Sequence, residues 1–264
     1  MSTSFWKGEA GGSIRTGPEG PGAILTGEGR LRMVERASAS VYRFKDDPYS
    51  SHSLILARLG DGRGRKLLDV GAADGFLAER LTAQGWTVTA LERDPALAAQ
   101  AHGRCKTVVV ADLEAAPPLL DGPFEAIVYG DVLEHLSDPR AALVALDRTL
   151  APGGTVVVSV PNVAHLWIRL SLLAGRFDYR DRGILDRTHL RFFTRRTLVA
   201  FLRGAGLAVD ELRVTPVPLP LVVPARWHGA WLDGLHACSA RAARLWPGGL
   251  AYQFVAVCRL AGGG

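Results

Sequence analysis

Short apolar segments alternate with helical segments from Lys66 to Val160, and this alternation restricts the fold more than any other feature of the sequence. Strands that alternate with helices at this spacing form crossover units, which build a parallel sheet covered by helices on both faces. The strands are apolar almost throughout, as expected when both faces of a sheet are buried. We predict strands at 66–70, 86–92, 108–111, 124–129, 155–160, 207–214 and 251–260, and helices at 75–84, 95–102, 139–150 and 194–203.

The regions outside this alternation differ from it in composition. Residues 1–30 hold eight glycines and two prolines with few large apolar side chains, so we predict a flexible tail. The pattern predicts a helical cap at 31–60 and the main domain at 61–264. Within that domain, residues 161–194 are irregular and arginine-rich, which indicates an inserted segment that roofs a site. We assign no structure to 216–250.

Charge and cysteine content exclude some classes of protein. The net charge of +5 mildly favours anionic partners. Cys105, Cys238 and Cys258 are widely spaced, which predicts neither a disulfide framework nor a zinc site. No apolar run approaches the ~20 residues of a membrane-spanning helix, and the N-terminus has neither the basic start nor the apolar core of a secretory signal. We expect a cytoplasmic protein without a transmembrane segment.

A loop of small residues follows the first predicted strand, in the sequence LLDVGAADGF. Such a loop lets a ligand approach the backbone closely, and the helix that follows favours an anionic group at its N-terminus. A dinucleotide site requires GxGxxG, but Ala73 and the bulky Phe76 occupy the second and third glycine positions. The spacing acidic-x-Gly-x-(Gly/Ala)-x-Gly fits better, with Asp69, Gly71, Ala73 and Gly75.

Acidic residues stand where the next predicted strands end. Glu92 ends the second strand, where a carboxylate can accept hydrogen bonds from both hydroxyls of a ribose, so it indicates a nucleoside without specifying which one. Asp112 follows the third strand, and Gly130 and Asp131 follow the fourth. Each could merely cap a loop, but ligands of open α/β sheets bind at this same edge. We therefore predict a nucleoside site there.

The loop and these acidic residues resemble the class I S-adenosylmethionine-dependent methyltransferases, and the resemblance covers residues 54 to 212. The segment Leu150-Ala-Pro-Gly-Gly resembles a turn common in this superfamily. The sequence FEAIVYGDVLEHLSDP is similar to the quinone-biosynthesis O-methyltransferases, and SVPNVAHLWIRLSLLAGRFDYRDRGILDRTHLRFFT to a bacterial group associated with glycan and secondary-metabolite pathways. Ala73 departs from the family, in which many members have glycine or cysteine.

The resemblance implies a Rossmann-like methyltransferase fold: an α/β, doubly wound, seven-stranded and mostly parallel sheet whose last strand is antiparallel, with an inserted cap segment. It implies S-adenosylmethionine as the cofactor. The residues that it places at the cofactor are Asp69, Gly71, Ala72, Ala73, Gly75, Phe76, Glu92, Arg93, Asp112, Leu113, Gly130 and Asp131.

Methyl transfer to a hydroxyl needs an aligned acceptor and benefits from a general base. Alignment can supply effective molarities of ~10⁵ M or more, and a base adds about 10²–10⁴-fold. Histidine suits that task near neutral pH. We predict His189 as the base or an acceptor contact, because it lies in the irregular insert. His135, after the fourth strand, is the alternative and could instead form a structural hydrogen bond or flank the adenine.

Three neighbouring residues could also bind a metal. Asp131, Glu134 and His135 are of types that bind divalent cations, and they resemble a set proposed for the quinone O-methyltransferases. Loop capping and cofactor contact explain the same residues, and we predict no metal.

The insert is strongly basic. Seven arginines lie between Arg176 and Arg196 against three aspartates. This excess fits either recognition of an anionic acceptor by guanidinium groups or a solvated surface. We interpret Phe192, Phe193 and Trp167 as core residues in preference to pocket lining.

These features predict a methyltransferase for a small-molecule acceptor, such as a hydroxyl of a sugar, a glycan precursor or a secondary metabolite. An RNA methyltransferase is the alternative. However, the (Asn/Asp)-Pro-Pro-aromatic motif of base-amine methylation is replaced by Tyr129-Gly130-Asp131-Val132, and no RNA-binding module is recognisable, so we do not expect nucleic acid as a partner. A non-catalytic binding protein is disfavoured by the intact loop and Glu92. Oligomer formation is left open.

Overall fold

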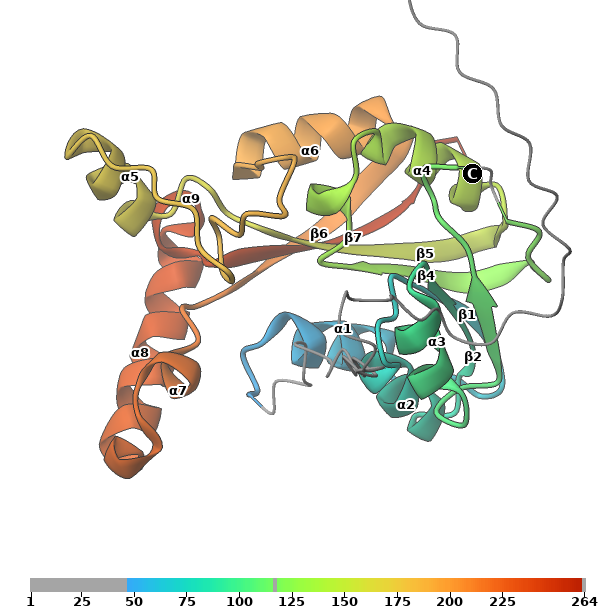
Figure 1. Cartoon of the computed structure of the whole chain (residues 1–264), viewed down its shortest axis with the longest axis horizontal. Coiled ribbons are helices and arrows are strands. Elements are labelled where there is room, and N and C mark those ends of the chain that lie inside the picture. Colours follow the sequence, from blue (N-terminus) through green and yellow to red (C-terminus); the bar gives the residue numbers. More distant parts are fainter. Residues whose placement is uncertain (1–46, 116–117, 263–264) are drawn as a thin grey trace, which may run out of the picture. The chain divides into compact units, whose positions relative to one another are not determined.

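The computed structural model describes residues 47–115 and 118–262. Within these ranges seven strands form one sheet in the order β3-β2-β1-β4-β5-β7-β6 (Figure 1). The strands are β1 (Lys66–Val70), β2 (Thr87–Glu92), β3 (Thr107–Val110), β4 (Phe124–Gly130), β5 (Leu150–Pro161), β6 (Leu207–Thr215) and β7 (Gln253–Leu260). β1 to β5 pair in parallel, whereas β7 is antiparallel to both β5 and β6. The predicted sheet is therefore confirmed.

The helices are α1 (Ser51–Leu59), α2 (Phe76–Ala83), α3 (Pro95–Ala101), α4 (Pro139–Asp147), α5 (Leu166–Leu173), α6 (Arg195–Gly204), α7 (Leu219–Val222), α8 (Ala230–Leu245) and α9 (Pro247–Leu250), with short 3₁₀ turns η1 (Leu133–His135) and η2 (Ala225–Trp227). Local sequence explains where several of them begin. Asp138 accepts the N–H of Ala141 at the start of α4, and Thr194 forms a capping box with Thr197 at the start of α6.

The two faces of the sheet carry separate apolar cores, because successive strand residues point to opposite sides. Leu67 packs with residues of α1 and α2 on one face. Its neighbour Leu68 packs with residues of α4 and α6 on the other. Helices thus cover both faces, and the strand order reverses between β1 and β4. This reversal is where an open α/β sheet binds its ligands.

The structure corrects several boundaries. α4 ends at Asp147 rather than at 150, because Leu150 already pairs with Phe124 as the first residue of β5. The insert predicted to be irregular contains α5, and α8 lies in the segment 216–250 that was left unassigned.

The interpretation of Trp167 as core is wrong. It lies on α5 with 64% of its surface exposed, whereas Phe193 is 6% exposed and belongs to the core. The predicted tail at 1–30 and the first part of the predicted cap, 31–46, lie outside the described residues. No helix within the described residues is both long and apolar enough to span a bilayer.

Asp147 is a buried acid at the end of α4, where it is 4% exposed. The Tyr129 hydroxyl donates to its Oδ1 at 3.3 Å. Its Oδ2 has no hydrogen-bond partner among the residues that the structure describes. Burial outweighs the hydrogen bond and raises the pKa of the carboxyl to about 7. Asp147 is therefore protonated in the folded protein below neutral pH.

Replacing Asp147 with asparagine should stabilise the fold at alkaline pH. The folded-state pKa of about 7 lies above that of the unfolded chain, so the free energy of unfolding falls as the pH rises from about 4 to about 7. Removing the acid should gain about 2 kcal/mol at pH 8 and almost nothing at pH 4. Urea unfolding at both pH values measures this, with the exposed Asp121→Asn as control. An equal gain at both pH values would contradict the assignment.

Candidate functional site

The loop between β1 and α2 has left-handed backbone at three positions: φ is +69° at Gly71, +50° at Ala73 and +83° at Gly75. The N–H of Gly71 donates to the carbonyl of Leu91 at 2.8 Å, which ties the loop to β2. A Cβ added to Gly71 would lie 2.5 Å from Cγ2 of Val132. The loop therefore requires glycine at this position for two reasons, its torsion angle and its contact with the segment after β4.

Glu92 connects this loop to the end of β2. Its Oε2 accepts the N–H of Ala73 at 2.8 Å, and its Oε1 accepts the N–H of Asp94 at 2.9 Å. The residue is 7% exposed. A carboxylate oxygen can accept more than one hydrogen bond, so both oxygens can still accept one from a ligand.

Asp69 lies on β1 and is 3% exposed. Its Oδ2 accepts no hydrogen bond from any described residue. Burial, followed by the nearby charge of Glu92, raises the pKa of Asp69 to about 7. The carboxyl ends of β1 and β2 thus hold two buried acidic groups, and one of them lacks a partner for one of its oxygens.

Other predicted cofactor residues lie around the same edge. Phe76 packs against His52 of α1, with ring centroids 4.9 Å apart. Asp112 is exposed and accepts an N–H of its own loop at 2.9 Å, so it does cap that loop. Leu113 packs against the core, whereas Arg93 is exposed.

Asp131, directly after Gly130 of β4, has left-handed backbone with φ of +56°. The Ser159 hydroxyl donates to its Oδ1 at 2.7 Å, and Nε2 of Gln253 donates to its Oδ2 at 2.8 Å. Its own N–H donates to Ser159 as well. Both carboxylate oxygens are therefore engaged within the chain, and they fix the loop after β4 to β5 and β7.

The two predicted catalytic histidines lie side by side. The N–H groups of Leu190 and Arg191 both donate to the carbonyl oxygen of Glu134, at 2.7 and 3.0 Å. This docks the insert against η1. The rings of His135 and His189 are consequently 4.8 Å apart, centroid to centroid, and meet edge to face.

His135 is oriented by a chain of hydrogen bonds. Its Nδ1 is 3.1 Å from the Thr188 hydroxyl, which donates to Oδ1 of Asp186 at 2.7 Å. The Thr188 oxygen is then left to accept the Nδ1–H of His135, so Nε2 carries the lone pair. Burial, and the neighbouring His189, lower the pKa of His135. The imidazole is therefore neutral at pH 7 and can accept a proton at Nε2.

His189 is more enclosed. It is 9% exposed, and its Nδ1 lies 3.1 Å from the carbonyl oxygen of Ile184. A carbonyl can only accept, so Nδ1 carries the proton here too. The Nε2 of His189 is therefore the ring nitrogen that is not held by this carbonyl, but it has less access to an acceptor than the half-buried His135.

The three residues that come together as possible metal ligands in the structure differ from the three considered in the sequence analysis. Glu134, His135 and His189 each offer one ligand atom, and these atoms lie within 4.8 Å of one another. Asp131 is instead held by Ser159 and Gln253. The cluster has the imidazole and carboxylate donors that suit a transition-metal ion.

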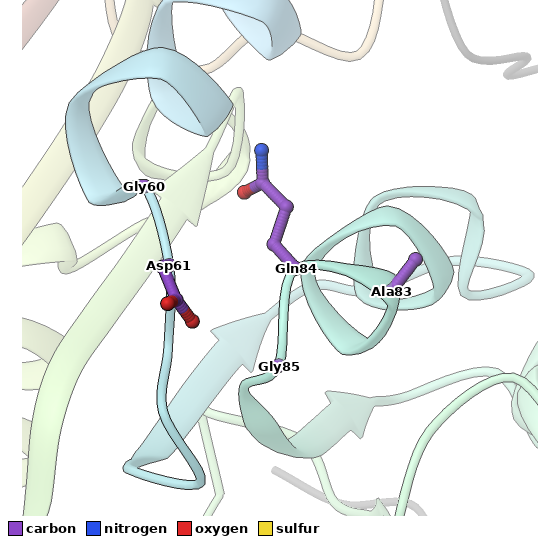
Figure 2. A pocket seen from close by; sticks show the side chains of 5 residues that line it. All are labelled: Gly60, Asp61, Ala83, Gln84 and Gly85. Carbon is purple, nitrogen blue, oxygen red and sulfur yellow. The ribbon is translucent and has the colours of Figure 1, made fainter.

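One hollow lies at the opposite end of the sheet. It has a volume of about 450 Å³ and is lined by Gly60, Asp61, Ala83, Gln84 and Gly85 (Figure 2). These residues precede β1 and β2, whereas the glycine loop follows β1. Ligands of such sheets bind beyond the carboxyl ends of the strands, so we do not assign the site to this hollow.

A family model described as a methyltransferase domain matches residues 46–212. The chain belongs to this methyltransferase family. The match contains the glycine loop, Glu92 and both histidines of the site. It confirms the methyltransferase family predicted from the sequence, with S-adenosylmethionine as its cofactor.

The methyltransferase is similar to the ubiquinone biosynthesis O-methyltransferase of Xylella fastidiosa (strain 9a5c), with 32% identity over 158 residues, which are 56% of this chain and 63% of the relative. It thus spans a little under two thirds of that protein.

Two solved structures show the same fold. Magnesium protoporphyrin IX methyltransferase from Synechocystis PCC 6803, with bound SAH, matches with a TM-score of 0.52 and 15% identity over 79% of this chain and 81% of that one. The [4+2]-cyclase SpnF matches with a TM-score of 0.54 and 21% identity over 83% and 86%. Because a protein described as a cyclase shares the fold, these likenesses establish architecture and not chemistry.

Sequence reasoning missed the residues that orient the site. Asp186 and Thr188 could have been found from the local sequence. A carboxylate and a hydroxyl two residues apart commonly form a hydrogen-bonded turn. Ser159 and Gln253 could not have been found in this way, since they lie 28 and 122 residues from Asp131 in the sequence. Only the pairing of β4, β5 and β7 brings them together.

Proposed function

We propose that this methyltransferase transfers the methyl group of S-adenosylmethionine to an oxygen of a small-molecule acceptor. The observation that carries the proposal is the placement of the histidine pair at the carboxyl edge of the sheet, joined to the glycine loop through Val132. In this proposal residues 61–264 form the catalytic domain and 161–194 roof its site. A cytoplasmic location is likewise a proposal.

The charges of the loop fit this cofactor better than a dinucleotide. S-adenosylmethionine carries a sulfonium and an ammonium group, whereas a dinucleotide brings an anionic pyrophosphate. Asp69 and Glu92 are both buried at the loop, and like charges in a low-dielectric region repel strongly. Glu92 would accept the ribose hydroxyls, and Asp69, with its unpartnered Oδ2, would face the cationic methionine part. The bound cofactor supplies the electrophilic methyl group.

Replacing Glu92 with glutamine should weaken binding of S-adenosylhomocysteine by about tenfold, because hydrogen bonds to a charged group contribute about 1.5–3 kcal/mol. Glutamine also turns an N–H₂ group toward one of the two backbone N–H donors, at Ala73 or Asp94. Titration calorimetry measures the affinity. The control is Glu79→Gln, an exposed glutamate in the first turn of α2. If both variants bind equally well, Glu92 does not contact the nucleoside.

The geometry favours His135 over His189 as the general base. Its Nδ1–H is held by Thr188 and, through it, by the carboxylate of Asp186. A negative charge at the end of this chain stabilises the imidazolium that forms when Nε2 accepts the hydroxyl proton. In this arrangement His189 packs edge to face against the ring of His135 and contacts the acceptor. This assignment reverses the preference drawn from the sequence, which favoured His189 over His135 as the base.

The cluster of Glu134, His135 and His189 supports a second mechanism. These three residues would hold a divalent cation, which lowers the pKa of a hydroxyl that binds to it. His135 would then be a ligand and could not serve as the base. Activity that survives a chelator supports the base mechanism, and activity that Mn²⁺ or Zn²⁺ restores after chelation supports the cation.

A second hollow of about 310 Å³ is lined in part by Phe192, whose ring centroid lies 6.4 Å from that of His189. Its lining includes Arg140, Arg191, Phe192 and Phe201. Guanidinium and aromatic groups together suit an acceptor with a planar part and an anionic group. The curated relative acts in ubiquinone biosynthesis, and a phenolic hydroxyl is therefore a class of acceptor to test beside sugar, glycan and secondary-metabolite hydroxyls.

The decisive experiment has two stages. Calorimetry should first show binding of S-adenosylhomocysteine to the purified full chain. Transfer of a labelled methyl group is then measured against phenols, sugars, acidic metabolites and tRNA. Label in a small molecule supports the proposal, and label in tRNA supports the RNA alternative. Cofactor binding without transfer to any acceptor supports a non-catalytic protein, and absence of cofactor binding overturns all three.

A further inference from the structure

Two neighbouring residues of the glycine loop are held by side chains from two other segments. Oε2 of Glu92, at the end of β2, accepts the N–H of Ala73 at 2.8 Å. At the next residue, Nη1 of Arg104 donates to the backbone carbonyl of Asp74 at 2.9 Å. A carboxylate therefore fixes a donor of the loop, and a guanidinium fixes an acceptor one residue later.

Arg104 reaches the loop from the turn between α3 and β3, and this turn packs directly on the loop. A Cβ added to Gly75 would lie 2.9 Å from Cβ of Ala101 and 3.5 Å from Cβ of Arg104. The N–H of Arg104 donates to the carbonyl of Ala101 at 3.1 Å, which fixes the start of its side chain. The guanidinium is thus delivered to the loop by a turn that is itself held in place.

The loop needs such support because its backbone conformation is unfavourable. Ala73 has φ of +50°, which a residue with a Cβ adopts only under constraint. α2 begins directly after Gly75, and no side chain among the described residues caps it. A strained segment keeps its conformation only when the surrounding structure imposes it. Glu92 and Arg104 supply that constraint at residues 73 and 74.

The carbonyl of Asp74 matters more here than its carboxylate. Nη1 of Arg104 also lies 3.2 Å from Oδ2 of Asp74, whose side chain is 14% exposed. However, Oδ1 of Asp74 is buried and has no hydrogen-bond partner among the described residues. The carboxylate is therefore incompletely satisfied, whereas the carbonyl accepts at an ordinary hydrogen-bond distance. We assign the hold on the loop to the carbonyl.

We propose that Arg104 is a positioning residue for the cofactor: it holds the carbonyl of Asp74 and so keeps the glycine loop in the conformation that binds S-adenosylmethionine. Without this contact the ligand would have to order the loop, and the free energy of ordering would be lost from binding. The inference rests on the proposed placement of the cofactor at this loop. It is independent of the acceptor and of the general base.

Replacing Arg104 with methionine should weaken binding of S-adenosylhomocysteine about tenfold in titration calorimetry, because a hydrogen bond from a charged donor is lost. Arg104→Lys keeps a charged donor and should bind within about threefold of the wild type. The matched control is Arg259→Met, which removes a contact of Nε with Oδ1 of Asp210 at 2.9 Å between β7 and β6. It should leave the affinity unchanged.

Hydrogen exchange separates positioning of the loop from general stability. The N–H of Gly75 donates to the carbonyl of Ala72 at 2.9 Å and reports on the loop. In the ligand-free protein Arg104→Met should speed its exchange at least about fivefold, while exchange in α6 and the thermal unfolding stay as in the wild type. Bound S-adenosylhomocysteine should remove the difference.

Asp74→Asn keeps the carbonyl and removes the charge, so it should bind within about threefold of the wild type. An equal loss of affinity in Asp74→Asn and Arg104→Met would overturn the proposal, because it would place the effect in the ion pair. So would unchanged affinity in Arg104→Met, or a loss that Arg104→Lys does not reduce. If Glu92→Gln weakens binding and Arg104→Met does not, the proposed function stands and this inference fails. Absence of binding to the wild type overturns the proposed function itself.

Discussion

Replacing His135 with alanine should lower kcat by about 10²–10⁴-fold, the usual contribution of a general base. The affinity for S-adenosylhomocysteine should stay the same, because His135 lies on η1 rather than in the glycine loop. A loss in kcat without a loss in cofactor affinity separates a role in the reaction from a role in binding. The measurement is release of S-adenosylhomocysteine, with any acceptor that the wild type methylates.

Two further variants make this result specific. Thr188→Val removes the hydroxyl that orients His135 and should lower kcat about fivefold, because one hydrogen bond contributes about 1 kcal/mol. The exposed His102, at the end of α3, provides the control, and His102→Ala should change nothing. If His189→Ala abolishes transfer while His135→Ala leaves it intact, the base is His189, as the sequence alone predicts.

Replacing Gly71 with alanine should weaken cofactor binding by at least about 100-fold. The new Cβ would lie 2.5 Å from Cγ2 of Val132, at a residue with φ of +69°. Valine has few alternative rotamers, so the loop itself must move, and the left-handed torsion adds about 1–2 kcal/mol. Calorimetry with S-adenosylhomocysteine measures the loss, and thermal unfolding shows whether the fold persists.

The contact and the torsion can be separated. Gly153→Ala is the control for the torsion, because Gly153 has φ of +75° and no atom within 4 Å of an added Cβ. It should cost stability and leave binding unchanged. Adding Val132→Ala to Gly71→Ala removes the contact and should recover part of the affinity. No recovery would mean that the torsion alone disables the loop.

The parts of the fold that depend on local pattern were predictable from the sequence. β1 begins and ends at the predicted residues, and α6 lies where the helix at 194–203 is predicted, with Thr194 as its cap. The glycine loop was readable because an uninterrupted strand leads into it and its torsions require small residues. The acidic residue Glu92 was readable for a similar reason, since it ends a strand whose limits are clear.

The remaining features depend on contacts between distant segments. α8 has no side-chain cap, since it begins after Gly229. Its apolar residues lie on a buried face, as at Leu232, and on an exposed face, as at Leu235, and this hides the one-sided apolar pattern by which an amphipathic helix is recognised. The hydrogen-bond chain of His135 needs the insert to dock on the carbonyl of Glu134. Trp167 was predicted to be a core residue, although tryptophan is often only partly buried.

The connection of Asp131 to Gln253 has a consequence for the synthesis of the chain. Gln253 begins β7, which lies between β5 and β6 and pairs with both. Until that strand has left the ribosome, β5 presents an unpaired edge and the loop after β4 lacks one of its two anchors. Nascent chains that stop short of residue 253 should therefore be unable to bind acceptor correctly and should aggregate through the open edge. Correct folding thus depends on β7, which is translated after the other six strands of this sheet.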